Sequence, residues 1–306
     1  MKNKLFIPAA LLCSALLLST AQGLQLPLPS ADSSLVGKIT SHQVTQSETI
    51  ADIARHYDLG YFELLEANPH IDPKNLIAGT QLVIPNQFLL PNAQRQGIII
   101  NLGTMRAFYF PKDQNYFFTY PVGIGKQDWS TPLGQLSIIE KIADPVWRVP
   151  KSIYEYRLQK GDPVPTSMPA GPDNPLGAFA LRLSKPTYLI HGTNEPASVG
   201  VRSSAGCIHL YPEDIKELFD KVAVGEPVLI INQPYQAGWD NQTLYVQAYL
   251  PLAEQREQLA DASVAIIDTI SQVAAATMQV DWHSAEETLQ DHTGLPTPVG
   301  ELKTQR

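Results

Sequence analysis

Residues 188–209 read YLIHGTNEPASVGVRSSAGCIH and hold the two side chains of this sequence best suited to covalent chemistry. His191 closes a run of strand-forming residues, and the Gly192 that follows it permits a sharp turn. Cys207 lies sixteen positions further along, directly after Gly206. An imidazole beside a thiol can take the thiol proton and leave a thiolate that attacks an acyl carbon. Taken alone, the two residues are equally compatible with an inert buried cysteine and a structural histidine.

We expect Cys207 to be the only thiol of the working protein. The other cysteine, Cys13, lies in an N-terminal segment with a positively charged start, an apolar run over residues 5–18 and small residues near its end. This pattern predicts an export signal that is cleaved after Ala21 or Gly23. An exported chain with one cysteine can form no internal disulfide, so its thiol is free and potentially reactive.

The net charge and the distribution of apolar residues argue against some classes of binding partner. Removal of the export signal would leave about 283 residues and change the formal net charge from −8 to −10. That acidic balance argues against binding to nucleic acid and against charge-driven binding to anionic lipid. No second long apolar segment follows the first, so we expect a soluble protein that works in the periplasm.

The pattern over residues 40–86 predicts a very small domain. Apolar residues at positions 50, 53, 54 and 57 form one face of a short helix, for which Ser47 or Thr49 can serve as the N-cap. A second short helix ends at Asn68-Pro69, because proline disfavours helical geometry in the residue before it. A turn then leads to a strand at 81–84. The order strand, helix, helix, strand fits either a binding module or a generic α+β packing domain.

The same segment resembles a lysin-motif (LysM) module. Four motifs that span the whole segment carry the resemblance: His42-Gln-Val44, Thr49-Ile-x-x-Ile-Ala54, Leu64-Leu-x-Ala-Asn-Pro69 and Gly79-Thr-x-Leu-x-Ile-Pro85. LysM modules bind the N-acetylglucosamine-containing glycan of bacterial cell walls. The resemblance therefore implies peptidoglycan as a partner.

Between residues 97 and 233 the sequence changes to short β-branched and aromatic runs divided by Gly, Pro, Asn and Asp, which predicts a mainly β domain. The expected strands are 97–100, 106–110, 116–122, 134–140, 178–183, 188–191 and 227–231. One helix interrupts them. It starts at Pro212, has two acidic residues in its first turn and buries Ile215, Leu218 and Phe219.

The remaining segments carry no visible chemistry. Residues 24–39 are rich in Pro and Ser and are expected to form an extended lead-in outside any core. Residues 234–306 predict a mixed accessory segment with a strand at 244–250 and a helix at about 261–278. The predicted organisation is an export signal (1–23), lead-in (24–39), LysM module (40–86), linker (87–96), catalytic domain (97–233) and C-terminal accessory segment (234–306).

His191-Gly192, followed by Gly200-Val-Arg-x-Ser-x-Gly-Cys-Ile208, resembles the active-site motif of the L,D-transpeptidases of bacterial cell walls, the YkuD type. Three further motifs agree: Gly123-Ile-Gly125, Thr131-Pro-x-Gly134 and Pro169-Ala-Gly-Pro-Asp-Asn-Pro-x-Gly177. The resemblance covers residues 97–233 and is closest to the periplasmic subgroup that attaches an outer-membrane lipoprotein to peptidoglycan. It implies a β-sandwich-like catalytic fold with a few helices, Cys207 as nucleophile and His191 as base.

Two positions depart from the family pattern. Ala205 stands where the family usually has a second histidine, and His209 stands where it usually has arginine or asparagine. A second histidine therefore has no part in this chemistry at position 205. His209 either substitutes for it in part, because alternate residues of an extended segment share a face, or has a structural role. Arg202 is retained, and either positions the substrate or the loop or is an ordinary solvated arginine.

The other predicted site residues surround the cysteine and the histidine. Gly206 and neighbouring amides are expected to form the oxyanion site. Ser204 either orients the reacting side chains or is an ordinary turn serine. Tyr188, Gly192 and Thr193 are expected to contact substrate. No metal or cofactor is expected, because one cysteine with scattered histidines lacks the spacing of a ligand set.

Together these features predict a cysteine-dependent enzyme that forms a thioester with a peptidoglycan tetrapeptide stem and passes it to an amine. The amine belongs to another stem's diaminopimelate or to a lipoprotein lysine. Two other functions remain open. Transfer of the same acyl group to water would make the chain an L,D-carboxypeptidase or hydrolase, and loss of acylation would leave a protein that only binds the wall.

Overall fold

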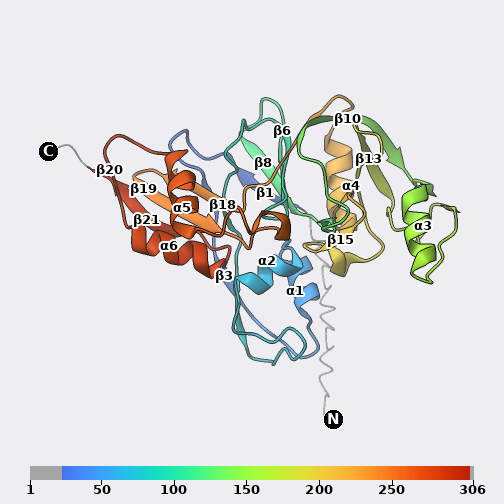
Figure 1. Ribbon diagram of the computed structural model, residues 1–306, viewed down its shortest axis with the longest axis horizontal. Helices are drawn as coiled ribbons and strands as arrows, with labels where there is room; N and C mark the ends of the chain where they lie inside the picture. Colours follow the sequence, from blue (N-terminus) through green and yellow to red (C-terminus); the bar gives the residue numbers. More distant parts are fainter. Residues whose placement is uncertain (1–22, 304–306) are drawn as a thin grey trace, which may run out of the picture.

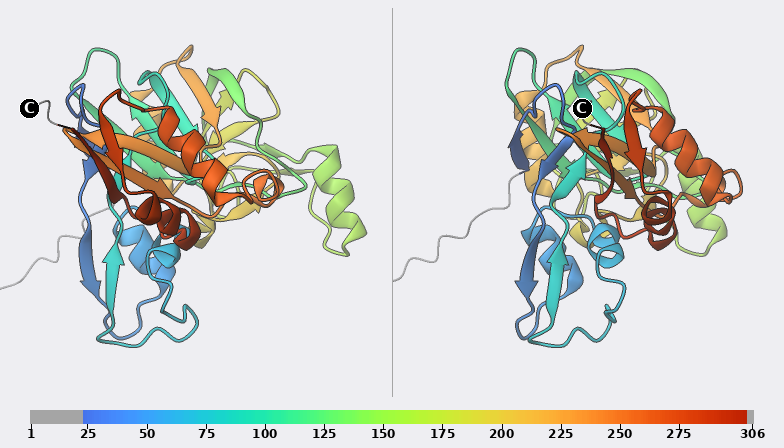
Figure 2. Two further views of the ribbon diagram at one scale, coloured as in Figure 1. Left: turned by 60° about the vertical axis from the view of Figure 1, so that its left-hand side comes forward. Right: turned by 90° about the vertical axis from the view of Figure 1, so that its left-hand side faces the viewer.

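The computed structural model describes residues 23–303 (Figures 1 and 2). The predicted export signal, with Cys13, lies outside the described residues except for Gly23. The chain is mainly β, as the sequence predicts. The LysM unit (blue to cyan in Figure 1), a large central sheet and a C-terminal unit (orange to red) contact one another in one body.

The centre of the molecule is a nine-stranded sheet with the order β1-β8-β7-β6-β17-β10-β13-β14-β16. Its strands are β1 (Leu24–Pro27), β6 (Gly97–Asn101), β7 (Arg106–Phe110), β8 (Tyr116–Pro121), β10 (Gly134–Ala143), β13 (Phe179–Leu183), β14 (Leu189–His191), β16 (Ile208–His209) and β17 (Pro227–Ile231). The pairs β6–β17 and β14–β16 are parallel. All seven strands expected from the β-branched and aromatic runs are present, with ends that shift by at most a few residues.

Both faces of this sheet are covered. One face packs against α4 (Pro212–Lys221), whose Ile215 and Leu218 join a core with Ile190 and Ile208. The helix begins at Pro212, as the sequence predicts. At the β1 end, the opposite face buries a second apolar cluster that contains Phe88, Phe108 and Phe117. The alternation of strand residues places apolar side chains on both faces, so this half of the sheet is buried on both sides.

The expectation that the lead-in lies outside any core is wrong. Residues Leu24–Pro27 form β1, an edge strand that pairs antiparallel with β8. Leu24, Leu26 and Leu28 pack against the Phe117 cluster. The alternation of leucines with other residues is the physical signal for this strand, and the surrounding prolines masked it. Beyond it, β2 (Leu35–Gly37) pairs with β5 (Gln87–Leu89), which occupies the predicted linker.

Residues 147–168 form an arm that projects from the sheet (green, at the right of Figure 1). It contains β11 (Trp147–Arg148), α3 (Lys151–Gln159) and β12 (Ser167–Met168). The prediction of one helix in the catalytic domain was therefore incomplete. Because α3 buries none of its residues, it lacks the apolar periodicity that would have revealed it. Its Tyr156 ring contacts the Trp129 ring edge-on, with centroids 5.8 Å apart.

The LysM unit has the predicted order of elements. These are β3 (Thr40–Gln43), α1 (Ile50–His56), α2 (Tyr61–Glu66) and β4 (Gln81–Ile84), and β3 pairs with β4. Thr49, not Ser47, caps α1: its Oγ1 accepts the Asp52 amide at 3.2 Å, and the Asp52 carboxylate accepts the Thr49 amide at 3.1 Å. This reciprocal capping satisfies two amides at the helix start.

The LysM unit is joined to the sheet by a buried ion pair. Arg106 on β7 donates from Nε and Nη2 to the two carboxylate oxygens of Glu63 on α2, at 3.0 and 2.7 Å. Both side chains are almost fully buried. A close contact lies beside it, where a Cβ added at Gly200 would stand 2.3 Å from the Gly60 Cα atom. The backbones of the two units therefore touch at glycines, and the LysM unit is fixed against the catalytic sheet.

The C-terminal unit has its own core and a four-stranded sheet (Figure 2). Its elements are β18 (Tyr235–Asp240), β19 (Thr243–Ala248), η2 (Ala253–Gln255), α5 (Ala262–Ser271), β20 (Met278–Val280), α6 (Trp282–Asp291) and β21 (Thr297–Leu302). The sequence predicts one of these strands and one helix. The helix α6 gives a weak signal because only Ala285, Thr288 and Leu289 are buried on it.

Short elements complete the fold: β9 (Ile124–Gly125), β15 (Arg202–Ser204) and η1 (Pro196–Ser198). β9 and β15 pair in parallel beside the end of the large sheet. Among residues 23–303, no helix has the length and apolar character needed to cross a membrane.

Candidate active site

His191 ends strand β14, and Cys207 directly precedes its parallel neighbour β16. Ile190 of β14 pairs with Ile208 of β16, and His191 pairs with His209. The two isoleucines point into the core shared with α4. Since successive side chains of a strand alternate between faces, His191 and Cys207 share the opposite face. The pairing of β14 with β16 thus places the segment that ends at His191 beside the segment that begins at Cys207.

A main-chain carbonyl orients the His191 ring. Nδ1 lies 2.6 Å from the carbonyl oxygen of Gly192, and that oxygen can only accept a hydrogen bond. Nδ1 therefore carries the proton, and Nε2 is left with a lone pair that can act as a base. Burial lowers the pKa of His191 to about 3, with a further contribution from His209, and the Gly192 carbonyl opposes the change. The ring is neutral throughout the physiological range.

Cys207 is half-buried and weakly held. Its Sγ lies 3.9 Å from the carbonyl oxygen of Thr187. Burial raises the pKa of the thiol, and the backbone of Leu189 opposes the rise by hydrogen bonding to the sulfur. The resting pair is therefore a thiol and a neutral imidazole, so the thiolate must form as the proton moves to the base.

Ser204 shapes the turn that carries the cysteine. Its Oγ donates to the carbonyl oxygen of Cys207 at 2.6 Å and accepts the amide of Gly206 at 3.1 Å. Gly206 has a φ of +102°, and a Cβ there would lie 2.8 Å from Cε1 of Tyr188. Only glycine suits this position. Because the Gly206 amide is already bonded, the amide of Cys207 is the better placed of the neighbouring amides for an oxyanion.

The His209 side chain contacts the loop that precedes the cysteine. Its Nε2 lies 3.0 Å from both the carbonyl oxygen and the Oγ of Ser198, and the ring is buried. The ring passes so close to Gly123 that a Cβ there would stand 2.1 Å from it. Its ring centroid is 6.1 Å from that of His191. These contacts favour the structural role that the sequence left open.

Arg202 is held by the C-terminal unit. Its guanidinium forms a two-pronged ion pair with Glu254, with distances of 2.8 and 2.9 Å, and Nε donates to the carbonyl oxygen of Gly125 at 3.0 Å. The side chain is mostly buried. Arg202 thus joins three segments around the cysteine loop, which favours loop positioning over substrate positioning or a solvated side chain.

The three residues predicted to contact substrate lie around the same loop. The Tyr188 ring covers Gly206. Gly192 donates its amide to the Phe179 carbonyl oxygen at 3.1 Å. Thr193 is buried, and its Oγ1 accepts the amide of Glu195 at 2.9 Å. Tyr188 is half-buried and has the Lys185 ammonium 5.3 Å from its ring centroid, whereas Gly192 and Thr193 serve mainly to build the turn after His191.

Residues 126–131 also lie beside the cysteine turn, although the sequence motifs marked only Thr131 among them. A Cβ at Gly125 would stand 2.1 Å from the Trp129 carbonyl oxygen and 3.0 Å from the Gly206 Cα atom. Thr131 Oγ1 accepts the Gly125 amide at 3.1 Å. The motif around Gly125 and Thr131 therefore exists to let this loop touch the cysteine turn. Gly125 was the only sign of this close contact in the sequence, and it did not indicate that Trp129 is the neighbour.

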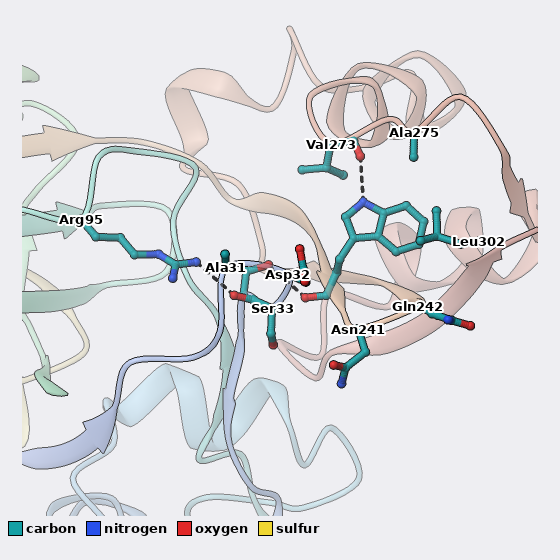
Figure 3. A pocket seen from close by; sticks show the side chains of 11 residues that line it. Ala31, Asp32, Ser33, Arg95, Asn241, Gln242, Val273, Ala275 and Leu302 are labelled. Carbon is teal, nitrogen blue, oxygen red and sulfur yellow. Dashed lines mark hydrogen bonds between the residues drawn. The ribbon is translucent and has the colours of Figure 1, made fainter. Parts of the chain in front are cut away.

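Residues 23–303 contain no group of three or more His, Cys, Asp or Glu side chains arranged to hold a metal ion. A hollow of about 660 Å³ lies elsewhere, between residues 31–34 and the C-terminal unit (Figure 3). Trp239 Nε1 donates to the Val273 carbonyl oxygen there, and Arg95 donates to that of Ser33. None of the predicted site residues lines it, so this hollow is not the candidate active site.

The acylation rate is expected to stay level from pH 7 down to about pH 5, because His191 remains neutral far below the usual titration of histidine near 6.5. The free energy of unfolding, unlike the rate, is expected to fall as the pH is lowered. The folded pKa lies below the unfolded one, so the contribution of neutral His191 is complete above pH 6.5 and is lost as the pH falls toward 3. Stopped-flow acylation at each pH tests the rate, and a midpoint near 6.5 would contradict it. The exposed His283→Gln serves as control.

Replacing Ser204 with alanine is expected to slow acylation by roughly 10- to 100-fold, because the turn loses both bonds that fix Cys207. Unfolding in urea should show a loss of about 1 kcal/mol. Ser203→Ala is the matched control, since the Ser203 Oγ makes only a 3.5 Å contact with His209. Equal rates for the two variants would show that Ser204 does not position the cysteine.

The chain matches two protein families and several bacterial relatives. The L,D-transpeptidase catalytic domain family (YkuD) matches residues 95–230, and the LysM domain family matches residues 42–85. The chain is 36% identical over 285 residues to the probable L,D-transpeptidase YbiS of Escherichia coli (strain K12), which covers 91% of this chain and 92% of that protein. It is 37% identical over 300 residues to the probable L,D-transpeptidase ErfK/SrfK of the same strain, with 94% and 96% covered. The chain therefore belongs to the L,D-transpeptidase family and is an enzyme with a YkuD catalytic domain and a LysM domain.

Proposed function

We propose that this chain transfers peptidoglycan tetrapeptide stems to an amine through a thioester on Cys207. The observation that carries the proposal is the arrangement of His191. Its Nδ1 proton is held by the Gly192 carbonyl oxygen, which leaves Nε2 as a base on the face of the sheet that Cys207 shares. A neutral imidazole next to a thiol activates it for attack on an acyl carbon.

In the first half-reaction, Cys207 Sγ attacks the carbonyl carbon of the diaminopimelate–D-alanine bond while His191 Nε2 takes the thiol proton. The negative charge that develops on the carbonyl oxygen is stabilised by the Cys207 amide. The carbon–nitrogen bond then breaks, His191 gives its proton to the departing D-alanine amine, and a thioester remains. The low pKa of His191 makes its protonated form a strong acid for this step.

In the second half-reaction an amine attacks the thioester carbon. His191 takes a proton from that amine, a new amide bond forms, and the cysteine leaves as a thiolate that recovers the proton. The acceptor is the side-chain amine of a second stem's diaminopimelate or a lysine of an outer-membrane lipoprotein. Tyr188 lies half-buried at the cysteine turn, and we assign it to contact the stem.

We further propose that the chain works in the periplasm after export. The predicted export signal and the LysM domain support this location. LysM implies binding to peptidoglycan, so the glycan would be held by one unit while its stem reaches the other. Arg202 and His209 keep the cysteine loop in place between the C-terminal unit and η1.

The full chain is expected to be retained on insoluble peptidoglycan, and Cys207→Ala should be retained equally, because LysM and the thiol lie on separate units. Co-sedimentation at several salt concentrations measures the retention. A protein that stays in the supernatant at all salt concentrations would contradict the assignment of the LysM unit to the wall.

Product analysis separates transfer from its alternatives. The protein is incubated with a disaccharide-tetrapeptide donor and either a second stem or a lysine-containing peptide, and products are identified by mass spectrometry. Transfer predicts cross-linked stems or lysine-linked stems. Shortened stems alone would indicate a hydrolase, and absence of any acyl-enzyme would indicate a wall-binding protein without catalysis. The same analysis of cell walls isolated with and without the protein then shows which linked product depends on it, and so identifies the natural acceptor.

A further inference from the structure

A pocket of carboxyl groups surrounds the start of β1. The backbone nitrogen of Leu24 donates to Oδ2 of Asp58 at 2.9 Å. Asp58 is 5% exposed, and Asp214, on α4, is 0% exposed. The two carboxyl groups are close enough that Asp58 raises the pKa of Asp214. Burying a carboxyl group is costly, and buried carboxyl groups normally have hydrogen-bond donors or a cation beside them.

That compensation is missing from the described residues. Both carboxyl oxygens of Asp214 and Oδ1 of Asp58 have no hydrogen-bond donor among residues 23–303. The nearby cations are already engaged: Arg106 with Glu63, Arg55 with Glu213 and Lys221 with Glu217. The surrounding tyrosines include Tyr211, which donates to the Leu59 carbonyl oxygen, and Tyr120, which donates to Glu217. The unpartnered oxygens therefore favour a cationic donor at this place.

The chain enters the pocket through a position that only glycine fits. Gly23 is buried, and a Cβ there would stand 2.0 Å from Cε1 of Tyr120 and 2.8 Å from a carboxylate oxygen of Glu217. Small residues at 21 and 23 also make the bond after Gly23 one of the two predicted cleavage positions. The same bond thus lies beside the acidic pocket and at a predicted processing position.

We propose that the mature chain begins at Leu24 and that its α-ammonium group binds in the pocket of Asp58 and Asp214. A peptidase hydrolyses the Gly23–Leu24 bond: water supplies the hydroxyl of the new Gly23 carboxylate, and the released Leu24 amine takes up a proton. One amide hydrogen beside Asp58 becomes three charged donors, which can satisfy the oxygens of both carboxylates. This inference rests on the proposed export of the chain, but not on the proposed chemistry at Cys207.

The unprocessed alternative is a carboxyl pair that shares a proton. Burial raises the pKa of Asp58 to about 7 and also raises that of Asp214, where Asp58 adds to the effect. An adjacent ammonium would reverse the direction for both carboxyls and raise the pKa of the amine above its usual value near 8. The two arrangements therefore differ in N-terminal residue, in charge and in dependence on pH.

The first test is the mass of the protein isolated after export from its own host. A mature chain that starts at Leu24 is expected. A start at Gln22, or an uncleaved chain, would overturn the proposal, and only the uncleaved chain would also count against export. Activity toward the donor stem is measured separately, so failure here is distinct from failure of the proposed function.

The second test is a four-protein comparison of thermal stability. Chains that start at Leu24 or retain Gln22-Gly23 are each made with Asp214 or with Asp214→Asn. Starting at Leu24 is expected to raise the Tm by about 5 °C only when Asp214 is present, and the gain should disappear above pH 10 as the amine loses its proton. An equal effect of Asp214→Asn in both chains would overturn the proposal. Asp220→Asn, at an exposed site on the same helix, is the control.

The third measurement needs no substitution. An amine-reactive reagent is applied near pH 8 to the processed protein, folded and in urea, and modification of the Leu24 amine is followed by peptide mass spectrometry. Labelling at least about 10-fold slower in the folded protein is expected because the amine is charged and enclosed. Equal rates in the two states would show an amine that lies outside the pocket.

Discussion

Replacing Cys207 with alanine is expected to abolish acyl-enzyme formation and to lower transfer by at least about 10³-fold, because no other thiol exists among residues 23–303. The fold should be little affected, since the half-buried Sγ makes only weak contacts with the backbone of Thr187 and Leu189. Intact-protein mass spectrometry after incubation with a donor peptide or a carbapenem measures the adduct directly.

His191→Gln provides the complementary variant. It retains a polar side chain beside Cys207 but removes the base, so the adduct should form slowly rather than vanish, with a rate that rises with pH as the thiolate forms unaided. An adduct that persists in Cys207→Ala would place the nucleophile elsewhere. A normal rate in His191→Gln would assign the base to another group.

Breaking the buried ion pair between the LysM unit and the sheet is expected to cost about 3–5 kcal/mol of the free energy of unfolding. Glu63→Gln leaves the Arg106 guanidinium buried with only Thr119 Oγ1 and the Asp58 carbonyl oxygen as full acceptors. It also weakens the cap of α2, where Glu63 accepts the Gly60 amide at 3.0 Å. Urea unfolding at pH 7 measures the loss.

Two comparisons make this result interpretable. The double variant Glu63→Leu with Arg106→Met removes both charges and should recover most of the loss, because desolvation of the lone charge is the dominant cost. Arg182→Gln breaks the exposed pair with Glu140 and should change stability by less than about 1 kcal/mol. Similar losses for Glu63→Gln and Arg182→Gln would show that burial does not govern the ion pair.

Local patterns predicted the elements that bury apolar side chains. The runs at 97–100 and 227–231 and the helix start at Pro212 were found because their residues repeat with the period of a strand or helix. The helix α3 escaped prediction because it buries nothing, and β1 because prolines obscured its alternating leucines. Elements held by a neighbour, rather than by their own apolar face, leave little trace in the sequence.

In the candidate active site, the sequence likewise indicated some residues and not the partners that hold them. Residue type and spacing singled out His191 and Cys207 but left inert roles open, and the family resemblance implied base and nucleophile. The pairing of β14 with β16 brings the two segments side by side. The partner that orients His191 is a main-chain carbonyl, which every residue possesses and no sequence pattern marks. The Glu254 that holds Arg202 lies 52 positions away in another unit, so no local period relates the two residues. Long-range polar contacts of this kind become visible only in three dimensions.

The contact of Gly60 with Gly200 has a consequence for how the enzyme would meet a polymer. The Tyr61 amide also donates to the Val199 carbonyl oxygen at 3.1 Å, eight residues before the cysteine. A module on a flexible tether samples a volume of positions, whereas one locked to the catalytic loop holds a bound strand at a single offset. The fixed distance between the two units would then select stems by their position along the glycan and by the direction in which they point from it.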